Sequence, residues 1–157
     1  MILEIGLLRL DPGVAESFSF LFNPVDAGDG CDLLGPVQVR GSMVYGGTAF
    51  LLDGCLTAKA RLPCGRCLSP VDVDIDFDFD EEFEEEDYPG EDAVVDLTEI
   101  ASQVWLTALP MRVLCRDDCK GLCPVCGKDL NEGDCGCPDE GADPRLEALR
   151  GFFPKED

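Results

Sequence analysis

Histidine is absent from this chain of 157 residues, although the chain holds ten cysteines. Without imidazole there is no Ser-His-Asp or Cys-His catalytic arrangement, no His-x-Glu deaminase site and no zinc finger with histidine ligands. Long apolar runs are also missing. A helix that crosses a bilayer needs about 18 consecutive apolar residues, and the chain has no such stretch. We therefore expect neither histidine-based catalysis nor a membrane partner.

Basic residues are scarce: 12 Lys and Arg stand against 33 Asp and Glu, a net charge of −21. Such a balance argues against a protein that coats nucleic acid through bulk charge. The first residues, Met1 to Ile5, carry no basic leader, so we expect no signal peptide and a cytoplasmic location. Thiols stay reduced there, which favours metal binding by clustered cysteines over disulfides.

The acidic residues are concentrated in residues 70–99, which contain 15 acids and no base. This segment opens with apolar and acidic residues in strict alternation, from Val71 to Asp80. Period-2 alternation predicts a half-buried antiparallel strand with its carboxylates on one face, turned to water or to a basic partner. The candidate partner-binding residues are Asp72, Asp74, Asp76 and Asp78. Residues 81–92 are expected to form a solvated acidic loop.

Upstream of this strand, apolar runs separated by turn residues predict further strands. They fall at about residues 2–8, 16–22, 36–46 and 48–61. Gly46-Gly47 between the last two is typical of a hairpin turn, and 24–35 is expected to be a flexible loop. The prediction is an α+β fold: an antiparallel meander of about five strands, one central helix and a C-terminal cysteine-rich zinc module.

The helix is predicted at about residues 96–109, because Asp96 and Glu99 form an aspartate version of the capping box and Pro110 ends the apolar period. Trp105 lies on the apolar face of this helix and is expected in the core. We divide the chain into a β-rich domain, 1–110, and a cysteine-rich module, 111–157. A short helix beginning near Asp143-Pro144 is predicted inside the module.

Eight of the ten cysteines have spacings typical of structural metal sites, where a Cys-x2-4-Cys turn presents two thiolates to one ion. The spacing suggests two four-cysteine sites. The local site comprises Cys123, Cys126, Cys135 and Cys137. The joining site, which connects two distant motifs, comprises Cys64, Cys67, Cys115 and Cys119. A different partition groups Cys115, Cys119, Cys123 and Cys126, so one or two structural zinc ions are expected. Four-thiolate sites also accept iron.

Cys64-Gly-Arg-Cys67 superficially resembles a thioredoxin redox pair. That chemistry needs a helix N-terminus at the first cysteine to lower the thiol pKa, whereas here Pro70 leads directly into the predicted acidic strand. A site closed by four protein ligands leaves no open position for a substrate. We therefore expect a structural metal, and Cys31 and Cys55 are expected to be plain buried thiols.

Half of the twelve basic residues lie close in sequence to the site that joins the two motifs. They are Lys59, Arg61, Arg66, Arg112, Arg116 and Lys120. One interpretation is that they neutralise thiolate charge and the neighbouring Asp117 and Asp118. The other is a small cationic face that contacts a phosphate backbone, which makes these six the candidate RNA-binding residues.

Two motifs in order carry a resemblance to a known family: Cys64-x-Arg66-Cys67-Leu68-x-Pro70, then Cys119-Lys-Gly-Leu-Cys-Pro-Val-Cys-Gly-x-x-Leu-Asn131 and a terminal Cys-x-Cys. Over roughly residues 40–137 the chain resembles the YceD family of large ribosomal RNA subunit accumulation proteins. The resemblance implies a factor needed for 23S rRNA to accumulate or be processed during large-subunit assembly. It implies no catalytic residues.

Two hypotheses follow, with an enzyme as a minor third. In the first, the basic face binds 23S rRNA or its precursor. In the second, the acidic strand mimics RNA and makes the protein a binding module or chaperone for a basic large-subunit ribosomal protein. A thiol oxidoreductase is the enzymatic alternative, and no small-molecule substrate is expected.

Overall fold

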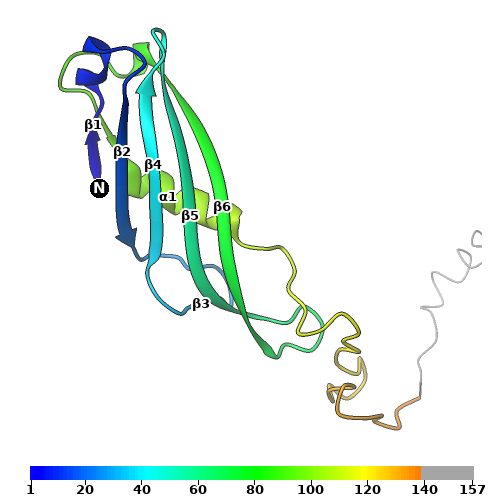
Figure 1. Cartoon of the computed structure of the whole chain (residues 1–157). Coiled ribbons are helices and arrows are strands. Elements are labelled where there is room, and N and C mark those ends of the chain that lie inside the picture. The colour runs from blue at the N-terminus through cyan, green and yellow to red at the C-terminus, as the bar shows by residue number, and fades with distance from the viewer. Residues whose placement is uncertain (139–157) are drawn as a thin grey trace, which may run out of the picture.

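The computed structural model describes residues 1–138, in which a five-stranded antiparallel sheet is crossed on one face by one α-helix (Figure 1). The strands are β1 (Ile2–Glu4), β2 (Ala15–Phe22), β3 (Asp32–Leu33), β4 (Val37–Tyr45), β5 (Ala49–Pro63), β6 (Pro70–Glu84) and β7 (Val94–Asp96). The helices are α1 (Leu97–Ala108) and the 3-10 helices η1 (Gly6–Leu10) and η2 (Glu85–Asp87). The predicted fold class is confirmed.

The sheet is a meander in which β2, β4, β5 and β6 follow one another, each antiparallel to the next. β3 pairs with the end of β5 beyond the reach of β4. The predicted Gly46-Gly47 hairpin joins β4 to β5, where the Gly46 amide donates to the Ala49 carbonyl at 2.9 Å. Gly47 has a φ of +101°, a conformation that residues with a side chain rarely adopt.

The strand predicted at residues 2–8 is wrong beyond Glu4. β1 is only three residues long and pairs with β7 in a separate two-stranded sheet, and η1 follows it. The amides of Ile5 and Gly6 both donate to the Ala93 carbonyl, at 2.9 and 3.1 Å, so regular pairing stops there. Leu3, Ile5 and Leu8 are buried, a spacing that suits a strand followed by a helical turn as well as it suits one strand.

The acidic loop predicted at 81–92 begins too early. β6 continues to Glu84, because Phe83 keeps the inward alternation and lies opposite Phe50 of β5. The loop predicted at 24–35 likewise contains the short strand β3.

The core lies between the inner face of the sheet and α1. Phe50 and Leu56 of β5 are completely buried, and so is Trp105, whose Nε1 donates to the Ala27 carbonyl at 3.2 Å. α1 begins after Asp96, which accepts a 2.9 Å hydrogen bond from the Thr98 amide. None of the helices among residues 1–138 is long and apolar enough to cross a membrane. The helix predicted near Asp143-Pro144 lies outside the described residues.

Candidate metal centres

Cys64 and Cys67 lie in the tight turn that joins β5 to β6. The Cys64 amide donates to the Ser69 carbonyl at 2.8 Å, and the Leu68 amide donates to the Cys64 carbonyl at 3.0 Å. This turn presents both thiols of Cys64 and Cys67 to the same side. β6 begins at Pro70, so no helix N-terminus lies at Cys64, unlike the arrangement of a thioredoxin redox pair.

The chain after α1 returns to this turn and docks on it through main-chain contacts. The Gly65 amide donates to the Val113 carbonyl at 2.8 Å, and the Leu122 amide donates to the Arg66 carbonyl at 3.3 Å. The Arg66 guanidinium donates to the Cys119 carbonyl at 2.6 Å. These contacts bring the third and fourth cysteines, at positions 115 and 119, to the β5–β6 turn.

The joining site therefore contains four sulfur atoms, those of Cys64, Cys67, Cys115 and Cys119, all within 4.8 Å of one another. Two of the S···S distances are 3.8 Å (Cys64 to Cys119) and 3.6 Å (Cys67 to Cys115). A zinc–sulfur bond of about 2.3 Å makes the edge of a tetrahedral site about 3.8 Å. The four side chains thus fit a tetrahedral four-thiolate metal ion, which they would hold without an open position.

The local site is built on a knuckle turn. The Cys123 amide donates to the Lys128 carbonyl at 2.8 Å, and the Gly127 amide donates to the Cys123 carbonyl at 2.9 Å. Gly127 has a φ of +73°. The sulfur atoms of the local site, those of Cys123, Cys126, Cys135 and Cys137, also lie within 4.8 Å of one another.

Hydrogen-bond donors favour the thiolate form at Cys64, Cys119 and Cys123, whereas burial raises the pKa of Cys115 to about 12 and the neighbouring Cys126 thiol raises that of Cys137 to about 12. The backbone N–H of Cys67 is the main cause that lowers the pKa of Cys64 to about 6, and the N–H of Cys126 does the same for Cys123. The Asn131 side-chain amide, 3.4 Å from the Cys119 sulfur, lowers the pKa of that thiol. A buried thiolate needs a compensating cation, so this donor set matches a bound metal ion.

The structure does not bring the sulfur atoms of the alternative partition, Cys115 to Cys126, into one group; it divides the eight cysteines as the two-site spacing does. None of the ten cysteines is in a disulfide. Cys31 is buried, but Cys55 is only half-buried, with its sulfur 3.5 Å from Asp76 on the solvent face of the sheet.

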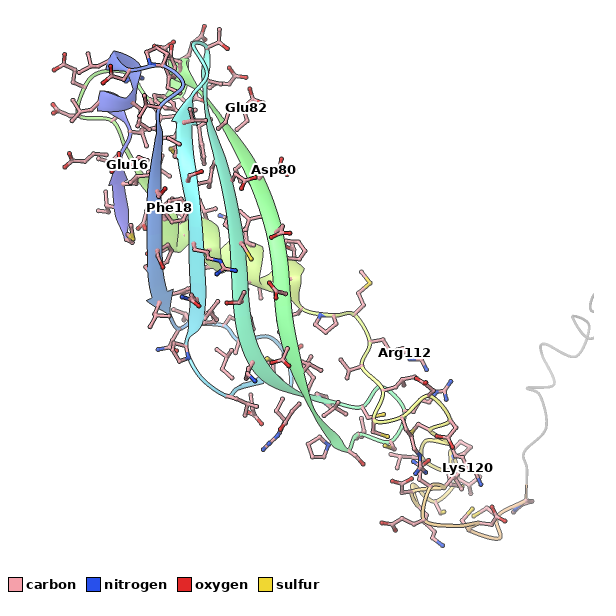
Figure 2. All side chains as sticks on the ribbon, in the orientation of Figure 1. Glu16, Phe18, Asp80, Glu82, Arg112 and Lys120 are labelled. Atoms are coloured by element: carbon pink, nitrogen blue, oxygen red, sulfur yellow. The ribbon has the colours of Figure 1, made fainter. Side chains whose placement is uncertain are left out.

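The six candidate RNA-binding residues lie in two places. Lys59 and Arg61 are on β5, where they form ion pairs with Asp74 at 3.2 Å and Asp72 at 2.6 Å. The other four belong to the β5–β6 turn and the cysteine module; they are Arg66, Arg112, Arg116 and Lys120. Figure 2 shows Arg112 and Lys120 on the module, at a distance from Asp80 and Glu82 on β6.

Asn131 is a positioning residue to which the sequence reasoning assigned no role. Its Oδ1 accepts hydrogen bonds from the Lys120 amide at 2.8 Å and from the Arg116 guanidinium at 2.7 Å. Its Nδ2 donates to the Cys119 sulfur. The available signal was its place at the end of the second cysteine motif.

The comparisons with known proteins identify a family for this chain. The family model for "Large ribosomal RNA subunit accumulation protein YceD" matches residues 52–153. The chain belongs to the YceD family. Its family match covers most of β5, together with β6, α1 and both cysteine groups.

Similar relatives of this YceD chain include a protein of Mycobacterium bovis and proteins of two Mycobacterium tuberculosis strains. Each is 35% identical over 111 residues, which cover 63% of this chain and 53% of the relative. The chain therefore matches about half the length of these relatives. They are described as uncharacterized, so they lend no activity, and no solved structure matches the chain.

Proposed function

We propose that this protein is a non-enzymatic cytoplasmic factor for 23S rRNA accumulation or processing during assembly of the large ribosomal subunit. Its membership of a family described by large ribosomal RNA subunit accumulation supports the role. Two zinc ions, one in each cysteine group, would hold the module against the end of the sheet. With all four positions of each ion taken by sulfur, the metal would serve structure and not catalysis.

The contact with rRNA is assigned to the cations of the module. The observation that carries this assignment is the separation of charge: Asp72 and Asp74 of β6 hold Arg61 and Lys59 in ion pairs. Arg112 and Lys120, in contrast, are exposed and lie at a distance from Asp80 and Glu82 of β6 (Figure 2). Arg66 and Arg116 are also exposed, although the Arg66 guanidinium donates to the Cys119 carbonyl and Arg116 pairs with Asp118 at 3.4 Å. The four cations together support a local contact with a phosphate backbone. The binding constant for RNA should therefore fall only modestly with salt, with a slope of about 3 when its logarithm is plotted against the logarithm of the salt concentration.

Ultraviolet crosslinking of the tagged protein in cells tests this function. Enrichment of one defined region of the 23S precursor is the expected result. If no RNA is recovered above the level of an unrelated acidic control protein, direct contact is contradicted. The effect on rRNA would then depend on a protein partner.

The second candidate function is that of a binding module for a basic large-subunit ribosomal protein. The specific observation in its favour is on β6, where Asp76, Asp78 and Asp80 point to solvent and take part in none of the ion pairs of residues 1–138. We expect the wild-type chain to retain a basic ribosomal protein. Replacing these three aspartates by asparagine should abolish that retention. Unchanged retention would contradict it.

A further inference from the structure

One edge of β6 is open along the whole strand in the described chain. Among residues 1–138, β6 pairs with β5 along its whole length and with no other strand, so its second edge is unpaired over 15 residues (Figure 1). An edge of that length presents a row of free backbone N–H and C=O groups, which another strand can pair with.

The register shows which residues carry those free groups. Pro63 lies opposite Pro70, and neither has an N–H, so this pair exchanges no hydrogen bonds. Bonded and non-bonded pairs alternate in an antiparallel ladder, so Leu62 and Val71, which come next, are bonded to each other. The bonds to β5 are thus made by the inward-facing residues of β6. The acidic, outward-facing residues, from Asp72 to Glu84, direct their backbone groups to the open edge.

The charges along this edge are compensated at one end only. On the neighbouring strand, Lys59 and Arg61 lie opposite Asp74 and Asp72 and form ion pairs with them. Further along, Asp78 lies opposite Cys55, and Asp80 lies directly opposite Asp53. Like charges opposite each other destabilise a sheet, so β5 supplies no cation to this half of β6.

The inner side of β6 is also incomplete. The inward-facing residues of β5, such as Phe50 and Leu56, are fully buried, whereas most of those of β6 are only half-buried. These half-buried residues are Val73, Phe77, Phe79 and Phe83. A further strand along the edge would cover them with its own inward-facing side chains.

We infer that the edge of β6 from Asp76 to Glu82 binds an extended segment of a basic protein as an added strand. This inference rests on the second candidate function and names the form of its partner. Lys or Arg would alternate with apolar residues, because the outward positions of this edge face Asp76, Asp78, Asp80 and Glu82, and its inward positions face Phe77 and Phe79. The remaining inward position holds the exposed Glu81, where the added strand needs no apolar residue. β5 already shows this pattern from Lys59 to Leu62. A second copy of the chain does not fit, since two acidic edges repel each other.

Fluorescence anisotropy with peptides of about ten residues, the upper range of strand lengths, tests the inference. One peptide alternates lysine and valine; its control has the same composition with the lysines in one block. The alternating peptide should bind the wild-type chain about tenfold more tightly, as expected from three opposite-charge pairs. Equal binding of both peptides would overturn the added strand and leave only a diffuse electrostatic surface.

Variants of β6 separate charge from backbone pairing. Asp78→Asn removes one carboxylate, and Asp78→Pro also removes the N–H that points to the open edge, a position where proline leaves the β5 ladder intact. Asp78→Pro should bind the alternating peptide about threefold to tenfold more weakly than Asp78→Asn, the loss expected for one hydrogen bond. Equal affinities of the two variants, with unchanged circular dichroism, would overturn the pairing.

A charge-matched control addresses net charge. Asp76→Asn, Asp78→Asn and Asp80→Asn together should weaken the alternating peptide about tenfold, whereas Glu4→Gln, Glu16→Gln and Asp11→Asn together should not. Equal losses in both triple variants would overturn the site. If the peptides fail to discriminate but a basic ribosomal protein is still retained, the edge is wrong and the second candidate function stands.

Discussion

The sulfur atoms of Cys64 and Cys119 lie 3.8 Å apart, although 55 positions separate them in the sequence. A metal ion shared by these residues would tie the β5–β6 turn to the module that follows α1. Because the unfolded chain has no preformed site, the free energy of metal binding at this point contributes to folding.

Replacing one cysteine of the joining site tests the partition. Cys64→Ser should lower the zinc content from two ions per chain to one, because only the local group keeps four thiolates. Cys55→Ser is the matched control and should keep both ions, since Cys55 lies outside both groups. Elemental analysis measures the number of zinc ions per chain. Two ions in Cys64→Ser would contradict the division of the eight cysteines into these two sites.

Removing the metal should unfold the module and spare the sheet. After chelation, the amides of Gly65 and Cys123, which are bonded within and around the two sites, should exchange rapidly with solvent. The emission of Trp105, the single tryptophan and a core residue, should stay unchanged. Protected Gly65 and Cys123 amides in the metal-free protein would show that zinc does not support the module.

The proposed rRNA contact predicts a difference between the two groups of cations. Arg112→Ala with Lys120→Ala should reduce RNA crosslinking and lower the salt slope by about 2, one for each lost phosphate contact. Lys59→Ala with Arg61→Ala removes the same charge from residues that already pair with β6, and should leave crosslinking unchanged. An equal loss in both double variants would indicate that only net charge matters.

The opposed carboxylates of Asp53 and Asp80 predict a stabilising substitution. Asp53→Asn should raise the free energy of unfolding by about 0.2 to 1 kcal/mol, the usual size of a cross-strand charge effect. The gain should shrink at high salt, which screens exposed charges. Chemical denaturation measures it, with Glu16→Gln on β2 as the control of equal charge; an equal gain in the control would point to general charge repulsion.

A hydrogen-bonded carboxylate near the hairpin end of the sheet predicts a pH effect. Glu85 accepts hydrogen bonds from the Tyr45 hydroxyl at 2.6 Å and from the Arg9 guanidinium at 3.0 Å, and the Tyr45 bond is the main cause that lowers the pKa of Glu85. Its stabilisation is complete above the ordinary pKa of 4.5 and is lost as the pH falls through the lower folded-state value.

The comparison of wild type with Glu85→Gln isolates this effect from the other acids. The difference in their melting temperatures should be largest near neutral pH and should shrink as the pH falls below 4.5 and through the lower folded-state pKa of Glu85. Tyr45→Phe should show a smaller difference with the same direction. A wild-type advantage that grows on acidification would contradict the assignment.

Local patterns in the sequence determined much of this protein. The alternation from Val71 to Phe79 placed a strand with one acidic face, the Gly46-Gly47 pair placed a hairpin, and Asp96 placed the start of the helix. Each of these depends on neighbours within a few residues, where backbone conformation and side-chain direction follow directly from residue type. The spacing of the cysteines paired near neighbours such as Cys64 and Cys67 for the same reason, but it left open which pairs share one ion.

Only the tertiary structure decided which distant residues meet. The register of β5 against β6 pairs Lys59 and Arg61 with aspartates and so takes them away from the cationic surface that their sequence position suggested. The apolar residues after Met1 were divided between β1 and η1 by the contact with Ala93. Strand register and such long-range contacts depend on how the whole core closes, which no local period encodes.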